Sequence, residues 1–167
     1  MKTAGQAKLI REPGKCIDNH FAFTVTTQTN YNSMQLTETQ IQETLARRPE
    51  SRYKYFIRTV MAEEEVWGLT DDEGWLMLED DEDGTDVIAV FPNEEFADIF
   101  KKRGDYAEFR AEPLDLFEFV DWLDDFETEK MKVGVFPTPD FQCAVMTPAR
   151  LREDFQIAFD KEEQNSK

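Results

Sequence analysis

The sequence predicts an α+β fold, with an antiparallel or mixed sheet of about six strands and about four to five helices packed on it. Strand-like runs come first as a group of three, then singly, then as a pair, and helix-like stretches separate these groups. Of the 167 residues, 40% are apolar and 14 are phenylalanine, which is enough material for one buried core. We therefore expect a single domain.

The first part of the chain differs in composition from the rest. Residues 1–33 carry a net charge of about +2, are mostly polar and contain one strand-like run at 21–26. We expect a polar N-terminal arm, which is either part of the fold or an upstream extension before a natural start at Met34. The folded domain is expected over residues 34–162, followed by a frayed tail at 163–167.

Two helices are predicted at the start of the domain. Thr37 and Gln40 have the spacing of a capping box, so a helix should run from there to about Arg48. Pro49 ends that helix, and Ser51 can cap a second one. The apolar residues of the second helix recur with the helical period and predict its buried face. These residues are Tyr53, Phe56, Ile57, Val60 and Met61.

Three strand-like runs follow, around residues 66–69, 75–78 and 87–91. The acidic turns 71–74 and 80–84 separate them, and each turn ends on a glycine. Glycine adopts the positive φ that tight turns need, and acidic residues favour turns as well. The pattern predicts an antiparallel meander of three strands.

The next group is helix, strand, helix. A short helix should follow Pro92, because acids come early in it and bases late, as the helix dipole favours. Residues 106–110 predict a fourth strand. A proline suits the first position of a helix, so a helix is predicted from Pro113 to about Phe126.

A hairpin and a last helix complete the predicted fold. The hairpin strands lie at 133–136 and 141–146, with two prolines in the loop between them. Thr147 and Pro148 then form a cap followed by a first-turn proline. The last helix buries a stripe made of Leu151, Phe155, Ala158 and Phe159.

Four segments of the sequence resemble a known family. They begin at Arg52 (RYKYFIR), Val66 (VWGLTDDEGW), Phe91 (FPNEEFA) and Lys132 (KVGVFP). Together they are similar to the uncharacterised bacterial family called domain of unknown function 2750, over residues 52–159. The resemblance implies a small bacterial cytoplasmic α+β protein, and it brings no reaction and no catalytic residues.

The charge excludes several classes of partner. The chain has 36 Asp and Glu against 19 Lys and Arg, a formal net charge of -17. Such a protein repels phosphate backbones and anionic lipids, so we expect neither direct nucleic-acid binding nor membrane binding. No apolar run is long enough to span a bilayer, and no secretion signal is evident. Cys16 and Cys143 are too far apart in sequence to predict a disulfide framework or a metal site, so a reducing cytoplasm is the expected location.

The common catalytic and cofactor motifs are missing. No serine lies in a Gly-x-Ser-x-Gly elbow, and no glycine-rich phosphate loop is present. The sole histidine, His20, lies in the arm and would need a cysteine nearby to form a nucleophilic pair. An EF-hand aligned on Gly84 would place Val90 where calcium needs a glutamate, which excludes that motif. We expect no cofactor and no dedicated metal site, and Cys143 should pack as a small buried side chain.

The surface acids are the candidate binding residues. On the predicted helix 113–126, acids recur every three or four residues, opposite an apolar stripe, and Phe117 and Trp122 widen that stripe. We expect an interaction or regulatory module that offers acidic turns and an acidic helix to a basic protein partner. The candidates are Asp71, Asp72, Glu73, Asp80, Asp81, Glu82, Asp83, Asp115, Glu118, Asp121, Trp122 and Asp125.

Two alternatives to this function remain at the level of sequence. In the first alternative, the acids imitate nucleic acid and so inhibit a nucleic-acid-binding protein. However, carboxylates one helical turn apart are spaced about 5.4 Å, whereas a duplex carries a charge about every 1.7 Å. The second alternative is a small enzyme that uses a carboxylate in an aromatic cleft near Trp67 or Trp75. The oligomeric state and the strand order are open.

Overall fold

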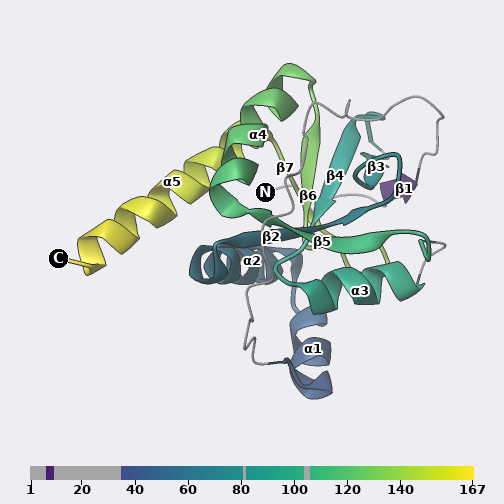
Figure 1. The fold of residues 1–167 in the computed structure, drawn as a ribbon, viewed down its shortest axis with the longest axis horizontal. Coiled ribbons are helices and arrows are strands. Elements are labelled where there is room, and N and C mark those ends of the chain that lie inside the picture. Colours follow the sequence, from purple (N-terminus) through teal and green to yellow (C-terminus); the bar gives the residue numbers. More distant parts are fainter. Residues whose placement is uncertain (1–6, 10–34, 81, 104–105) are drawn as a thin grey trace.

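The computed structural model describes residues 7–9, 35–80, 82–103 and 106–167. Within these ranges it contains five helices and seven strands, which confirms the α+β class (Figure 1). The elements are β1 (Ala7–Leu9), α1 (Glu38–Leu45), α2 (Pro49–Glu63), β2 (Glu65–Thr70), β3 (Met77–Asp80), β4 (Asp86–Val90), α3 (Glu94–Arg103), β5 (Arg110–Asp115), α4 (Leu116–Thr128), β6 (Lys132–Val135), β7 (Ala144–Met146) and α5 (Pro148–Asn165). The strand predicted at 21–26 lies outside the described residues.

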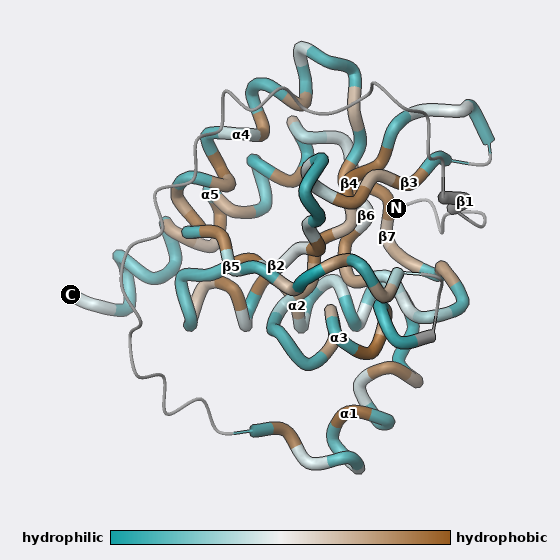
Figure 2. The backbone as a smooth tube through the Cα atoms, turned by 45° about the vertical axis from the view of Figure 1, so that its right-hand side comes forward, coloured by the Kyte–Doolittle hydropathy of each residue, from teal (hydrophilic) through white to brown (hydrophobic). Residues whose placement is uncertain are grey.

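The larger sheet is mixed, as predicted. Its strand order is β1-β3-β4-β6-β7, and β4 and β6 pair in parallel while the other neighbours are antiparallel. The predicted late hairpin is present as β6 and β7. The parallel pair at the centre runs from Val87↔Lys132 to Val90↔Val135, so most of the strands' side chains are buried. Figure 2 shows hydrophobic residues concentrated on these central strands.

The first strand of the expected meander takes a different partner. β2 pairs with β5 in a separate two-stranded sheet, through six residue pairs. It meets the larger sheet at an isolated bridge, where the backbone N–H groups of Trp67 and Phe91 donate to each other's carbonyls at 3.0 and 2.8 Å. The two-stranded sheet therefore lies across the end of β4.

Gly68 is required for the packing of the β2–β3 turn. A Cβ atom placed on Gly68 would lie 2.3 and 2.6 Å from two ring carbons of Trp75, far inside van der Waals contact. The indole of Trp75 occupies the space that any other side chain would need. Trp75 also meets Trp122 of α4 edge-on, with ring centroids 5.5 Å apart. This contact joins the turn to the helix behind it.

Pro113 lies in a strand, and the prediction that it starts a helix is wrong. It pairs with Trp67 within β5, and α4 begins only at Leu116. Proline is tolerated at the edge of a sheet, where its missing N–H need not pair. The carboxylate of Asp115 provides the helix start instead, because it accepts hydrogen bonds from the N–H groups of Phe117 and Glu118 at 2.9 and 3.1 Å.

Two of the three predicted caps are confirmed, and the third is wrong: Ser51 lies inside α2, which begins at Pro49 with Arg48 as its N-cap residue and no side-chain cap. Thr37 Oγ1 accepts from the N–H of Gln40 at 3.2 Å, and the Gln40 side chain accepts from the Thr37 N–H at 2.9 Å, which completes the capping box. Thr147 Oγ1 accepts from the N–H of Arg150 at 3.3 Å, and Pro148 takes the first position of α5. Each cap joins residues three apart and depends on local sequence alone.

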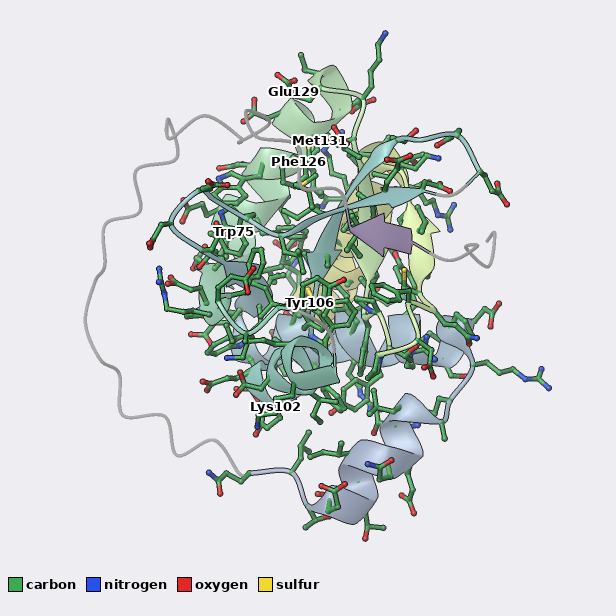
Figure 3. The ribbon with its side chains drawn as sticks, turned by 90° about the vertical axis from the view of Figure 1, so that its right-hand side faces the viewer. Trp75, Lys102, Tyr106, Phe126, Glu129 and Met131 are labelled. Atoms are coloured by element: carbon green, nitrogen blue, oxygen red, sulfur yellow. The ribbon has the colours of Figure 1, made fainter. Side chains whose placement is uncertain are left out.

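The helices surround the two sheets on different sides. α4 and α5 lie side by side, α3 packs against β2 and β5, and α2 contacts β2, β7 and α5 (Figure 1). Figure 3 shows Tyr106 on the inner side of α3 and Lys102 on its outer side, which matches the 4% exposure of the Tyr106 side chain. No helix within the described residues has the length and apolar character to cross a bilayer.

Candidate functional site

The predicted acidic turn at 71–74 uses one of its carboxylates to hold its own backbone. Asp71 Oδ1 accepts from the N–H groups of Glu73 and Gly74 at 2.8 and 3.1 Å, and Gly74 has a φ of +139°. Asp72 is 96% exposed and lies 3.5 Å from the guanidinium of Arg110. Only Asp72 and Glu73 are thus presented fully to water.

The second predicted turn, at 80–84, contains an internal counter-ion. The Lys132 ammonium from β6 donates to Asp80 Oδ2 at 2.9 Å and to Asp83 Oδ2 at 2.6 Å. Asp80 is 8% exposed, so it is buried instead of facing solvent as expected, and its other oxygen accepts the N–H of Glu82 at 2.9 Å. Asp81 lies outside the described residues.

The Lys132 contacts shift two pKa values in the directions expected for ion pairs. The hydrogen bond from Lys132 lowers the pKa of Asp83 to about 2. Burial lowers the pKa of Lys132, but the hydrogen bonds to Asp80 and Asp83 outweigh burial, so its pKa is raised overall. Lys132 pairs with both Asp80 and Asp83 within the chain, which makes these two carboxylates weak candidates for an external partner.

Helix α4 divides its predicted binding residues into two groups. Trp122 is 5% exposed and packs against Trp75, so it belongs to the core. Glu118, Asp121 and Asp125 are exposed at helical spacing on one face, and no Lys or Arg in the described ranges forms an ion pair with any of them. These three carboxylates are the free charges that the structure brings together.

Acidic residues continue along α4 to its C-terminal end, where the helix dipole disfavours negative charge. Residues 115–129 hold seven Asp and Glu and no Lys or Arg. The carbonyl end of a helix disfavours anions, yet the last turn carries acids and no base. Arg152 of α5 compensates part of this charge through ion pairs with Asp124 and with Glu127, the latter at 3.4 Å. Asp125, also in the last turn, has no such partner among the described residues, so its charge lowers the stability of the helix.

An exposed aromatic stack lies next to these acids, on the seam between α4 and α5. Phe117 is 53% exposed, and its ring stacks on Phe159 with centroids 5.6 Å apart and planes 13° from parallel. The sequence predicts Phe117 at the border of the apolar stripe of helix 113–126 and Phe159 within the buried stripe of the last helix. The sequence alone cannot predict that Phe117 is exposed, because its exposure depends on how much of α4 is covered by α5.

Sequence reasoning missed the buried arginine of α2. Arg52 is 2% exposed and has no carboxylate partner among the described residues. Its guanidinium donates to the carbonyls of Arg47 at 2.5 Å, Gln142 at 2.6 Å and Phe136 at 3.4 Å. Arg52 lies four residues before Phe56, on the predicted buried face, and this spacing was the signal that could have revealed it.

The segment that Arg52 holds is backbone of unusual conformation. Phe136 and Phe141 have φ values of +54° and +61°, a backbone conformation that residues other than glycine rarely adopt. Burial lowers the pKa of Arg52 and raises the pKa of the neighbouring Cys143 thiol to about 12. Cys143 is fully buried and neutral, which suits packing and not nucleophilic attack.

No metal centre emerges from the described part of the chain, where no group of three or more His, Cys, Asp and Glu is placed to hold an ion. In the acidic turn at 80–84, the Lys132 ammonium lies between the carboxylates of Asp80 and Asp83, in the position that a bound cation would take. The arrangement offers exposed charge and one exposed aromatic stack.

Comparison with protein families identifies a match for most of the folded region. A protein-family model described as "Protein of unknown function (DUF2750)" matches residues 53–155, more than half of the chain. The matched region runs from α2 to α5 and contains both sheets except β1. No curated protein matches the sequence.

Proposed function

The chain belongs to the DUF2750 family, and from this premise we propose that it is a small cytoplasmic interaction or regulatory module, which binds a basic protein through the exposed carboxylates of α4. The observation that supports the proposal is the set formed by Glu118, Asp121 and Asp125, exposed together without a cation of the described chain beside them. Asp125 lies in the last turn of α4, where the helix dipole disfavours negative charge. A bacterial source is part of the same proposal.

Electrostatic magnitudes indicate what such a surface contributes. An exposed ion pair adds about 0–1 kcal/mol, so three carboxylates add little affinity by themselves. Their larger effect is on the association rate, which an acidic field raises by about 10–1000-fold at low salt. We therefore expect fast, salt-sensitive binding of a basic partner.

The test is capture of binding proteins by the immobilised full chain at low and high salt. The variant E118Q/D121N/D125N removes three charges from α4, and the control E43Q/E94Q/D140N removes three exposed charges from other elements. We expect basic proteins to be retained by the wild type and by the control, and to be lost from the α4 variant and at high salt. Equal capture by both variants would refute the role of α4.

The nucleic-acid mimic is the more specific form of this function, and the same experiment separates the two. Added DNA duplex should displace the captured proteins only if they bind the chain through their nucleic-acid site. The dilute spacing of carboxylates along one helix favours the general form. If the captured proteins stay bound in excess duplex, the result supports the general acidic interaction module and not the nucleic-acid mimic.

A further inference from the structure

We propose that the partner surface is the seam between α4 and α5, and that its occupant is a basic amphipathic helix with an apolar side chain that packs on Phe117. This proposal rests on the proposed function and adds the chemical form of the partner. It begins with exposure: among the residues that the structure describes, Phe117 and Ile157 are the two large hydrophobic side chains left exposed, at 53% and 44%.

The contacts show how the seam is built. Arg152 of α5 meets Asp124 and Glu127 near the end of α4, Phe155 meets Phe119, and Phe159 meets Phe117 at its start. The two helices therefore run antiparallel along their contact, and the Phe117–Phe159 stack joins the first turn of α4 to the later part of α5. Figure 1 shows α5 continuing outward beyond this point.

Acids lie next to the stack on both helices. On α4, Asp121 lies one helical turn after Phe117, and Glu118 directly follows Phe117 in the sequence. The side chains of Glu118 and Asp121 are both exposed. On α5, Glu162 and Glu163 lie three and four residues beyond Phe159 and are exposed. An apolar contact surrounded by carboxylates has the composition of an interface core with a charged rim.

Charge decides which occupant fits this surface. A second copy of the chain would bring its own net charge of -17 against the same acids, so like-charge repulsion opposes self-association. A basic helix with one apolar face satisfies both features, because its apolar residue covers the ring of Phe117 while lysines or arginines reach the acids. Two adjacent antiparallel helices also offer the ridges and grooves on which a third helix packs.

Ile157 provides a matched control. It lies two residues from Phe159, about 200° around α5, and so faces away from the α4 seam. Ile157→Ser and Phe117→Ser each remove one exposed apolar side chain, but only the second removes the stack. Both side chains are about half exposed, so both variants should stay folded, and the melting temperature should fall by only a few degrees, more for Phe117→Ser because it loses the stack on Phe159.

The experiment measures binding of a labelled synthetic peptide to the full chain by fluorescence anisotropy. The probe is a helix of leucine and lysine with all leucines on one face, and a scrambled peptide of the same composition serves as its partner control. Phe117→Ser should weaken binding of the amphipathic peptide about tenfold, Ile157→Ser less than about twofold, and neither should change binding of the scrambled peptide. Raising the salt to about 0.15 M should weaken both peptides.

Several results would overturn the proposal. If E118Q/D121N/D125N loses the peptide while Phe117→Ser keeps it, the seam is refuted and the proposed acidic function stands. If Phe117→Ser loses the peptide while the acid variant and added salt change nothing, the basic partner and the proposed function both fail. If sedimentation shows a dimer that Phe117→Ser dissociates, the occupant is a second copy and the proposal is wrong.

Discussion

Replacing the buried arginine of α2 tests how the β6–β7 segment is held. Arg52→Met keeps much of the side-chain volume and removes every hydrogen bond to the three backbone carbonyls. The bonds to Arg47 and Gln142 are short, at 2.5 and 2.6 Å, and the bond to Phe136 is long, at 3.4 Å. A hydrogen bond from a charged donor contributes about 1.5–3 kcal/mol, so the two short bonds alone predict a loss of about 3–6 kcal/mol.

Part of this loss is recovered, because methionine packs its apolar stem where the arginine stem lay. We expect the free energy of unfolding to fall by about 3 kcal/mol, equivalent to a melting temperature lower by roughly 6–12 °C for a domain of this size. Urea unfolding followed by tryptophan fluorescence measures it. Arg52→Lys keeps the charge but cannot reach all three carbonyls, so its loss should be intermediate.

The control for this series is Lys54→Met, which removes one exposed cation from the same helix. It should change the free energy of unfolding by less than about 0.5 kcal/mol. If Arg52→Met unfolds within that same margin of the wild type, the carbonyl contacts do not hold the segment, and the reasoning about the buried guanidinium is wrong.

Three other perturbations test separate parts of the structure. Gly68→Ala forces the ring of Trp75 to move, so we expect a loss of about 1–3 kcal/mol and a shifted tryptophan emission; unchanged emission and stability would contradict the close packing. In a Cys16→Ser background, Cys143 should resist iodoacetamide at about pH 8 in the folded protein and react in urea, because burial raises its pKa to about 12. Mass spectrometry detects the adduct, and rapid labelling of the folded chain would refute the burial. The pKa of Asp83 is lowered from 3.8 to about 2, so the stability that its ion pair contributes is present above about pH 4 and is lost as the pH falls through 2. In melting temperatures measured against pH, Asp83→Asn should therefore show a smaller decrease over this range. An unchanged decrease would count against the ion pair between Asp83 and Lys132.

The parts of the fold that the sequence predicted well are those fixed by neighbours along the chain. The caps at Thr37 and Thr147 each need only a residue three positions away, and both are confirmed. The turns at Gly74 and Gly84 have the positive φ that their acidic-glycine sequences indicate. Local propensity and local hydrogen bonds decide these features, so no knowledge of the tertiary structure was needed.

The parts that could not be predicted depend on residues far apart in sequence. The six residues of β2 pair with β5, whose residues follow about forty-five positions later, and no local pattern selects that partner over the next strand. Lys132 meets Asp80 across 52 positions, so the sequence could not show that Asp80 and Asp83 are paired within the chain. Glu118, Asp121 and Asp125 were predicted as exposed because the helical period alone places them opposite the apolar stripe.

The parallel pairing of β4 and β6 has a consequence for the synthesis of this protein. The two strands at the centre of the larger sheet belong to segments 45 residues apart, and α3, β5 and α4 all lie between them in the chain. A nascent chain leaving the ribosome therefore carries β3 and β4 with an unpaired central edge until Val135 has emerged, when most of the protein has been made. Over that interval the growing polypeptide exposes its most apolar strand, and chaperones have their best opportunity to hold it.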